Sequence, residues 1–245
     1  MRFDGKVVLV TGADRGIGKA VVERFLTEGA RLVAADLGPT GCERYQNDPR
    51  VAVVLGDVTI RADAERMVGT AIERFGRLDV LVNNAGIVDR FLPVGELTDE
   101  LWDKVLAVNL TGPMLLSRAA IPHLTRSKGV IVNVSSVGGL FGARAGAAYV
   151  ASKHGLIGLT RNIAVTYASE GVRAVVVAPG GVNTGISIGG EPSARGYEAL
   201  KKTLAAGVRM AEPAEIAAVI AFAASSEASF VNGEVIVADG GWTAY

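Results

Sequence analysis

The chain has 245 residues, of which 49% are apolar and only 6% aromatic. This length allows one large α/β domain, and a core of mainly Val, Ala, Leu and Ile suits parallel strands that are buried on both faces. Lys plus Arg (25) balances Asp plus Glu (25), which excludes a general attraction to nucleic acid or to anionic lipid.

Short apolar runs alternate with stretches of helical spacing along the chain. The runs predict strands at Lys6–Val10, Arg31–Asp36, Val51–Leu55, Leu78–Asn83, Gly129–Val134, Arg173–Ala178 and Glu234–Ala238. The spacing predicts helices at Ile17–Glu28 before Gly29, Asp63–Phe75 before Gly76, from Asp99 after the N-cap candidate Thr98, Tyr149–Ser169, and Ala214–Ala224 after Pro213. This alternation predicts βαβ units with right-handed crossovers, and hence a single doubly wound α/β domain over residues 1–245 with about seven parallel strands and helices on both faces.

The segment Gly185–Gly207 fits neither pattern well. It is rich in Gly and Ser at its start and then carries a weak helical pattern at Tyr197–Ala205. A flexible loop with one small helix at this place is typical of a lid over an active site. We therefore predict a substrate lid at about residues 185–210.

Few residues are suited to hold a metal or to enter a membrane. Cys42 is the only cysteine, which excludes an intramolecular disulfide and a cysteine-based zinc cluster, and the two histidines are far apart in the sequence. The apolar stretch Val7–Val10 is shorter than a signal-peptide core, and no apolar run reaches membrane-spanning length. We expect a cytoplasmic protein with no resident metal and no membrane or nucleic-acid partner.

A glycine-rich turn follows the first predicted strand. From Thr11 the sequence reads Thr-Gly-Ala-Asp-Arg-Gly-Ile-Gly and leads directly into a helix. Glycines allow a tight turn and the close approach of a pyrophosphate, and the helix N-terminus adds free N–H groups and partial positive charge. The spacing G-x-x-x-G-x-G differs from the commoner G-x-G-x-x-G, so an ordinary glycine turn is the alternative. The predicted dinucleotide-binding residues of this turn are Gly12, Asp14, Arg15, Gly16, Ile17 and Gly18.

Other strand ends support a dinucleotide site of the Rossmann type. Asp36 closes the second predicted strand, about 20 residues past the glycine turn, where a carboxylate binds the adenosine ribose hydroxyls. Asp57 and Val58 follow the third strand and are expected beside the adenine. The fourth strand ends in Asn83-Asn84-Ala85-Gly86. Ligands of open α/β sheets bind outside the carboxyl ends of the strands, so these pieces converge on one crevice.

Three polar residues near the same crevice could carry chemistry. Tyr149 and Lys153 are four residues apart at the start of a predicted helix, so their side chains share a face. Ser136 lies thirteen positions upstream of the tyrosine (149 − 136), just past the end of the fifth strand. Taken alone, Tyr-x-x-x-Lys is a weak signal and equally describes a polar pair on a solvated surface.

With these motifs the sequence resembles the short-chain dehydrogenase/reductase family over nearly its whole length. The resemblance rests on Thr11-Gly12-x-x-x-Gly16-Ile17-Gly18, Asn83-Asn84-Ala85-Gly86, Asn109, Ser136, Tyr149-x-x-x-Lys153 and Pro179-Gly180-x-x-x-Thr184, in the family's order and at its spacing. It implies a homotetramer with the helix from Tyr149 and the C-terminal segment in interfaces. It also implies a catalytic tetrad of Asn109, Ser136, Tyr149 and Lys153, with Ser136 favoured over Ser135 by its distance from Tyr149. The further cofactor contacts that it implies are Asn84, Ala85, Gly86, Tyr149, Lys153, Pro179, Gly180, Val182 and Thr184.

The residue types of this tetrad suit hydride transfer at a carbinol carbon. A tyrosine with a pKa near ~10 is a poor base at neutral pH, and the ammonium of Lys153 together with the charge of an oxidised nicotinamide would lower that pKa. Ser136 would donate a hydrogen bond to the substrate oxygen. Asn109 is expected to hold a water that links Lys153 to solvent, and Thr184 and the Val182 backbone are expected near the nicotinamide amide.

We expect an NAD-dependent dehydrogenase of a small secondary alcohol, polyol, sugar or cyclic alcohol. Asp36 would repel the 2′-phosphate of NADP and so favours NAD. Arg15 favours the opposite preference, because a basic residue in the glycine loop often accompanies the use of NADPH. One alternative is an NADPH-dependent 3-oxoacyl-[acyl-carrier-protein] reductase. Glu170 argues against it, because carrier-docking relatives often have arginine there, although Arg126 and Lys128 partly compensate. The remote alternative is a non-catalytic dinucleotide-binding regulator, which the intact tetrad disfavours.

Residues beside the tetrad have more ordinary interpretations. His154 follows Lys153 and points away from the Tyr149 face of the helix, so we assign it a structural role. Cys42 is expected to be inert. Loop residues flanking the crevice either contact substrate or are simply solvated; they are Asp89, Arg90, Phe91, Val137, Phe141 and Arg144.

Overall fold

A computed structural model describes residues 1–38, 41–186, 188–204 and 208–244. Its centre is a seven-stranded parallel sheet with the strand order β3-β2-β1-β4-β5-β6-β7. The strands are β1 (Val7–Thr11), β2 (Arg31–Asp36), β3 (Val51–Leu55), β4 (Val80–Asn83), β5 (Val130–Val134), β6 (Arg173–Pro179) and β7 (Val235–Ala238). The predicted fold class is thereby confirmed.

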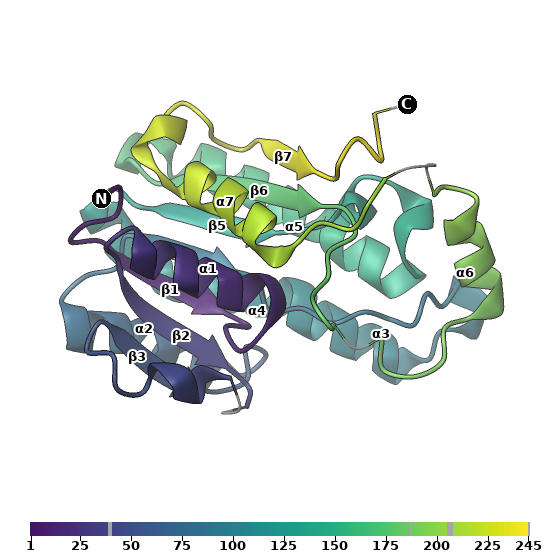
Figure 1. Cartoon of the computed structure of the whole chain (residues 1–245), viewed down its shortest axis with the longest axis horizontal. Coiled ribbons are helices and arrows are strands. Elements are labelled where there is room, and N and C mark those ends of the chain that lie inside the picture. The colour runs from purple at the N-terminus through teal and green to yellow at the C-terminus, as the bar shows by residue number, and fades with distance from the viewer. Residues whose placement is uncertain (39–40, 187, 205–207, 245) are drawn as a thin grey trace.

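Helices cover both faces of this sheet (Figure 1). The α-helices are α1 (Gly16–Thr27), α2 (Arg61–Phe75), α3 (Asp99–Leu106), α4 (Gly112–Ser127), α5 (Ala147–Thr166), α6 (Ala194–Lys201) and α7 (Pro213–Ala224). Short 3₁₀ turns occupy η1 (Cys42–Tyr45), η2 (Val94–Glu96), η4 (Val137–Gly139), η5 (Gly142–Arg144), η6 (Ala168–Glu170) and η7 (Ser226–Ala228), and a π-helical turn η3 (Ala107–Thr111) joins α3 to α4.

Alternate residues of each strand enter two separate cores, as the pleat requires. Val8 and Val10 of β1 pack with α1 and α7, whereas Val7 and Leu9 pack with α2, α4 and α5. Both faces of the central strands are therefore buried, and this explains why their sequences read as continuous apolar runs.

The helix boundaries follow local signals that the sequence displays. Gly76 adopts a left-handed conformation (φ 79°) at the C-cap of α2, and the Thr98 hydroxyl accepts a hydrogen bond from Leu101 N (3.3 Å) at the start of α3. Pro213 begins α7. These three predicted caps are confirmed, because each depends only on residues next to it in the chain.

One helical stretch is longer and more apolar than the sequence analysis indicated. From Asp99 to Ser127 the chain is helical without a break, and by length and composition alone this stretch would pass as a membrane span. Its apolar side chains, among them Leu115, Leu116 and Leu124, are instead buried in the core that covers one face of the sheet. Packing on the sheet therefore accounts for its apolar character.

The predicted lid contains α6 at one side of the molecule, beyond the carboxyl ends of the strands (Figure 1). The helix begins at Ala194, earlier than the predicted Tyr197, because the Ser193 hydroxyl caps it by accepting a hydrogen bond from Gly196 N (3.2 Å). Residues 187 and 205–207 of the predicted lid lie outside the described residues.

Candidate active site

The turn between β1 and α1 has the backbone of an anion-binding loop. Gly12 and Gly16 take positive φ angles of 65° and 54°, which residues with a Cβ rarely adopt. Arg15 is the exposed N-cap of α1, and among the described residues no side chain caps this helix or places an acid in its first turn. The N-terminus of α1 therefore keeps its N–H groups and its partial positive charge available for a phosphate.

Close packing holds this loop against its neighbours. A Cβ on Gly18 would lie 1.9 Å from the Gly12 carbonyl oxygen, so α1 approaches β1 as only a glycine permits. Ile17 packs onto the core beneath. The Asn84 side chain donates to the carbonyls of Thr11 (2.9 Å) and Gly12 (3.2 Å), which ties the end of β4 to the loop.

The far corner of the loop is built around Asp36. Its carboxylate ends β2 and accepts hydrogen bonds from the backbone N–H groups of Asp14 (2.9 Å) and Leu37 (2.7 Å). Arg44 donates to the Asp14 carbonyl (3.4 Å) from η1, and sequence reasoning did not find it because η1 carries no motif. Asp36, Asp14 and Arg44 thus lie at one corner of the loop.

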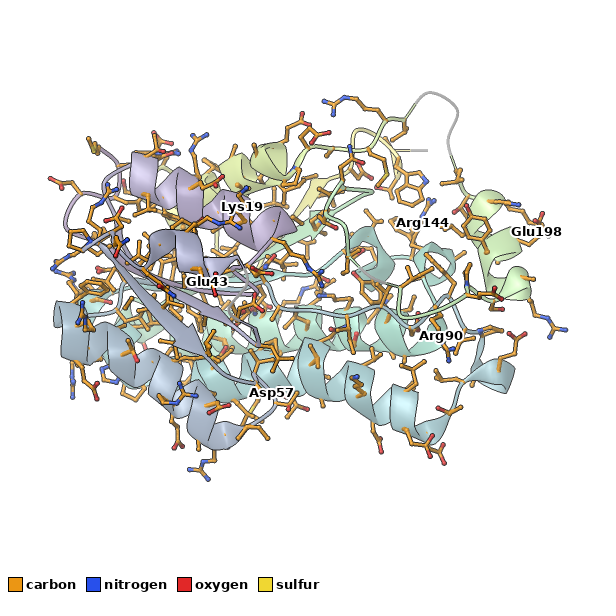
Figure 2. The ribbon with its side chains drawn as sticks, turned by 60° about the horizontal axis from the view of Figure 1, so that its bottom comes forward. Lys19, Glu43, Asp57, Arg90, Arg144 and Glu198 are labelled. Carbon is orange, nitrogen blue, oxygen red and sulfur yellow. The ribbon has the colours of Figure 1, made fainter. Side chains whose placement is uncertain are left out.

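Asp57 and Val58 follow β3 as predicted, and the loop that holds them is tightly fixed. The Asp57 carboxylate accepts hydrogen bonds from the backbone and the hydroxyl of Thr59 (both 2.8 Å). Val58 is buried, and a Cβ on Gly112 would lie 3.0 Å from its Cγ2. These contacts place the loop against the beginning of α4 (Asp57 is labelled in Figure 2).

The segment after β6 crosses over the glycine loop. A Cβ on Gly180 would lie 2.9 Å from Asp239 Cα, whereas a Cβ on Gly16 would lie 2.8 Å from Thr184 Cβ. Val182 forms a parallel bridge with Ala211 that fixes this crossing. Pro179-Gly180-x-x-x-Thr184 and the glycine loop, far apart in sequence, are therefore neighbours in space.

The predicted tetrad is assembled at the start of α5. Tyr149 and Lys153 share one face of the helix, with the lysine Nζ 5.6 Å from the centre of the tyrosine ring. Ser136 follows β5, and its Oγ and the Tyr149 ring both adjoin Gly138, where an added Cβ would lie 3.5 Å and 3.3 Å from them; Ser136 lowers the pKa of the tyrosine. Ser135 is instead buried and donates to the Lys153 carbonyl (3.1 Å), so Ser136 and not Ser135 faces Tyr149.

Lys153 and Asn109 meet beside Gly86. The Lys153 Nζ donates to the Val134 carbonyl (2.8 Å), and a Cβ on Gly86 would lie 3.6 Å from that Nζ and 3.3 Å from Asn109 Oδ1. Asn109 lies in the π-helical turn η3, and its amide bonds the backbone N–H (2.9 Å) and carbonyl (3.0 Å) of Ile87. Single π-turns inside α-helices occur frequently at functional sites.

Burial sets the titration of the two central residues. It lowers the pKa of Lys153 from 10.5 to about 8, because the charged ammonium loses its hydration. The pKa of Tyr149 is raised, chiefly by burial, and the carboxylate of Asp89 raises it further against the lowering by Ser136. The chain's own groups therefore do not produce the low tyrosine pKa that the sequence analysis expected; Lys153 would have to be charged, with a cationic cofactor beside it, to do so.

Two buried residues of the site escaped sequence reasoning. The Ser152 hydroxyl donates to the Tyr149 carbonyl (2.7 Å) and accepts from Asn109 (3.1 Å), joining two members of the tetrad. Asp89, which was given only as a loop residue, is completely buried. Its partners are far away in the sequence, so no local pattern could have revealed them.

The side residues behave more simply. His154 is exposed and its ring Nδ1 contacts the Val150 carbonyl (2.9 Å), away from Tyr149. Cys42 is buried, and that burial raises the pKa of its thiol to about 11, so it carries little thiolate.

Comparison with known proteins agrees with this geometry. Residues 12–243 match a family model described as enoyl-(acyl carrier protein) reductase, a short-chain dehydrogenase/reductase model. The chain is 41% identical to 3beta-hydroxysteroid dehydrogenase 2 of Eggerthella lenta, covering 98% of this chain and 96% of that protein. It is 38% identical to a 3-oxoacyl-[acyl-carrier-protein] reductase of Thermotoga maritima, covering 98% and 99%.

A solved structure extends the likeness to the fold. The crystal structure of levodione reductase superposes with a TM-score of 0.89 at 35% sequence identity, covering both chains completely. Family membership of this kind implies an oxidoreductase with a nicotinamide dinucleotide cofactor. On its motifs, its sheet order and these matches, the chain belongs to the short-chain dehydrogenase/reductase family.

Proposed function

We propose that this enzyme transfers a hydride between NAD and the carbinol or carbonyl carbon of a small secondary alcohol or ketone. The observation that carries the proposal is the arrangement of Ser136, Tyr149 and Lys153. A Cβ on Gly138 would lie 3.3 Å from Tyr149 Cε1 and 3.5 Å from Ser136 Oγ, and the Lys153 Nζ lies 5.6 Å from the centre of the tyrosine ring. This arrangement combines two hydroxyls that can meet one substrate oxygen with a cation behind them.

Side chains of the tetrad would transfer the proton of the substrate hydroxyl. The Ser136 hydroxyl and the Tyr149 side chain hold the substrate oxygen. The tyrosinate form of Tyr149 takes the proton during oxidation, and its neutral hydroxyl donates a proton during reduction. Lys153 favours the tyrosinate when it is charged. Asn109 is anchored to Ile87 and Ser152 in the π-turn, which suits it to position a water behind the lysine.

The cofactor is proposed to lie across the carboxyl ends of β1 and β4, where the strand order reverses. The uncapped start of α1 suits its pyrophosphate, and Lys153, beside Gly86, suits the nicotinamide ribose. Thr184 and the Val182 backbone, beside the glycine loop, suit the nicotinamide amide. When bound, the nicotinamide accepts or donates the hydride.

We propose NAD rather than NADP because the Asp36 carboxylate ends β2 and would repel a 2′-phosphate. Leu37, where phosphate-binding relatives often place an arginine, is 72% exposed and offers no charge. Arg15 and Arg44 stand nearby and favour the opposite preference. Comparing kcat/KM for NAD with kcat/KM for NADP tests the proposal, and a higher value with NADP would contradict it. In the Asp36→Asn variant the two kcat/KM values should lie closer together than in the wild type.

A free small molecule is the proposed substrate, in keeping with the hydroxysteroid dehydrogenase and levodione reductase among the similar proteins. The carrier-bound alternative is favoured by the family model's description and by the Thermotoga maritima relative. The sequence argument that Glu170 disfavours docking of an acyl-carrier protein is weaker in the structure. Glu170 and Lys128 precede β6 and β5, so within one chain they lie at the amino ends of the strands, opposite Tyr149.

A direct competition tests the substrate. Free secondary alcohols and ketones, including a 3-hydroxysteroid and a cyclic diketone, are compared with a 3-oxoacyl ester on acyl-carrier protein, following nicotinamide absorbance. We expect the highest kcat/KM with a free compound. The highest value with the carrier-bound ester would replace the proposal by the reductase alternative.

A further inference from the structure

A buried carboxylate outside the tetrad contacts the catalytic helix. Asp89, in the loop between β4 and α3, has no exposed surface. Its Oδ1 accepts a hydrogen bond from Gly146 N (3.1 Å), and its Oδ2 accepts one from Tyr149 N (2.9 Å). Both donors belong to the N-terminus of α5, and one is the backbone of the proposed acid–base residue itself.

This contact replaces a cap that the helix cannot make for itself. The first N–H groups of an α-helix have no partner within the helix, and a side chain at the N-cap normally accepts from them. The N-cap of α5 is Gly146, which has no side chain. A Cβ at that position would lie 2.4 Å from the Asp89 Oδ1, so the glycine makes room for a carboxylate that arrives from another segment.

The chain after Asp89 forms a strained reverse turn, here named the Asp89–Leu92 turn. Leu92 N donates to the Asp89 carbonyl (3.1 Å), and the two residues between them, Arg90 and Phe91, have φ angles of 55° and 57°. Left-handed angles at two successive residues with side chains are costly and persist only where the surroundings hold them. The Leu92 carbonyl in turn accepts from Ala147 N (2.9 Å), a further bond to the start of α5.

The opposite side of the same turn seats the lid helix. The Arg90 carbonyl accepts from Ser193 N (2.9 Å) just before α6, and a Cβ on Gly196 would lie 1.7 Å from the Phe91 carbonyl oxygen. The rings of Phe91 and Tyr197 meet edge to face with centroids 6.0 Å apart. Figure 2 shows Arg90 on the side of the molecule where α6 lies.

We propose that Asp89 is a positioning residue that fixes the Tyr149 backbone for catalysis, and that the Asp89–Leu92 turn links this fixed point to the lid helix α6. The inference rests on the proposed role of Tyr149. It goes beyond it by naming what holds that residue in place, and by making the seating of the lid and the placement of the acid–base group depend on one four-residue turn.

The charge of Asp89 gives the role a signature that a mere packing contact lacks. Its carboxylate raises the pKa of Tyr149, so its removal should ease formation of the tyrosinate. The other charged groups on this side are Arg90 in the same turn, Lys153, one turn along α5, and Arg144 in η5, and the charged residues of α3 (Asp99, Glu100, Asp103 and Lys104) are exposed. Those groups are unchanged in the Asp89 variants, so a shift would report on Asp89.

The test compares four variants with one control. Asp89→Ala should lower kcat by roughly 10- to 100-fold, the size of effect that a small misplacement of a catalytic group produces, with little change in KM for the cofactor. Gly146→Ala should also lower kcat, because the added Cβ displaces the carboxylate while Asp89 itself remains. Asp89→Asn should move the pH profile of oxidation towards lower pH. Phe91→Ala, which leaves Asp89 in place, should raise the substrate KM and spare kcat.

Asp79→Asn is the matched control. Asp79 is also a buried carboxylate that accepts from a backbone N–H, that of Val7 (3.0 Å), but it precedes β4 at the other end of the sheet. The Asp79→Asn variant should keep the wild-type kcat and the wild-type pH profile. If Asp89→Ala fails to fold, Asp89→Asn and Gly146→Ala still decide. Wild-type kcat and an unshifted pH profile in those two variants would overturn the inference, whereas an active Tyr149→Phe variant would overturn the proposed function beneath it.

Discussion

The hydroxyl of Tyr149 is the single group on which the proposed chemistry depends most. Tyr149→Phe removes it and keeps the ring, so the fold and cofactor affinity should persist. Turnover should fall by about 10²–10⁴-fold, the usual contribution of a positioned acid–base group. Steady-state kinetics together with a cofactor-binding titration measure both quantities. Turnover close to that of the wild type would mean that another group handles the proton.

The buried ammonium of Lys153 should destabilise the folded state at neutral pH. Because burial lowers its pKa from 10.5 to about 8, the unfolded chain binds the lysine proton more tightly than the folded chain. The free energy of unfolding should therefore rise as the pH increases from about 8 to 10.5. Below about pH 8 the lysine is protonated in both states, and its desolvation lowers the free energy of unfolding by the full amount. Lys153→Met, which removes the penalty, should raise the free energy of unfolding at pH 7 by up to about 3 kcal/mol.

Denaturant unfolding at pH 7 and at about pH 10 measures this effect. The gain over the wild type should shrink at the higher pH, where the wild-type lysine is largely neutral in the folded chain. A Lys153→Met variant less stable than the wild type at pH 7 would show that the lost hydrogen bond to the Val134 carbonyl (2.8 Å) outweighs the desolvation of the ammonium. Turnover should be lost in either case.

Some residues of the site could be predicted from short sequence motifs, whereas others depend on contacts between segments that are distant in the sequence. Ser136, Tyr149 and Lys153 belong to short motifs. Ser135 donates to the Lys153 carbonyl whereas Ser136 lies beside Tyr149, because one step along the chain turns a side chain in another direction. Asp89 is the opposite case. Its partners, Gly146 and Tyr149, are 57 and 60 positions away, so its burial depends on a tertiary contact that no spacing rule describes.

At the scale of elements, the strands were predicted best. Each differs from its predicted range by at most two residues at either end, since runs of Val, Ala, Leu and Ile bounded by polar residues are distinctive. Helix α4 was not delimited in advance because it follows α3 through a π-turn and contains Pro122, two features that local propensity reads as interruptions. The start of α6 was misplaced because Ser193 stands among glycines and prolines, and its capping bond is visible only in the structure.

The far end of the lid offers an element-scale prediction. Beyond α6, the Thr203 carbonyl accepts hydrogen bonds from Arg144 Nη1 and Trp242 Nε1 (both 2.6 Å), and the guanidinium lies 4.3 Å from the centre of the indole ring. The lid is thus fastened to the loop before α5 and to the C-terminal segment. Trp242→Ala should loosen it, raising the substrate KM and speeding proteolysis near residue 203 while sparing kcat.

A second variant separates the two contributions of this indole. Trp242→Phe keeps an aromatic face for Arg144 and removes only the N–H donor, so its KM should lie between those of the wild type and Trp242→Ala. Limited proteolysis with mass spectrometry locates the cleavage. Unchanged KM and an unchanged cleavage rate in Trp242→Ala would show that the lid does not depend on this contact.

For the whole molecule, parallel strands were predictable but their order was not. The reversal of order between β1 and β4 is what brings the glycine loop, the Asn84 side chain and the start of α5 to one edge of the sheet. Sequence patterns indicate which strands exist, and the convergence of distant motifs on a single crevice follows only when the crossovers are known.

Assembly is the prediction that belongs to the molecule as a whole. Apolar side chains are exposed near β7: Val165, 81% exposed, lies at the end of α5 beside Ala164, whose carbonyl accepts a hydrogen bond from Asn232 (3.0 Å), while Phe230 is completely exposed and Val237 is 42% exposed. Figure 1 shows β7 at the edge of the sheet, where its outer side has no neighbouring strand. Exposed apolar patches and unpaired edges of this kind commonly mark interfaces between chains.

A tetramer with two-fold symmetry needs two distinct self-complementary surfaces on each chain, and we predict the homotetramer that the family resemblance implies, with this surface as one of the two. Light scattering at micromolar concentration should therefore give four chains per particle. Val165→Glu and Phe230→Glu should each disrupt this surface and leave dimers, because the second surface of the tetramer still pairs. Val94→Glu is the matched control: Val94 is also 81% exposed but lies in η2, away from this surface, and the variant should remain tetrameric. A monomeric wild-type protein would refute the assembly, and tetramers in both glutamate variants would show that the contacts lie elsewhere.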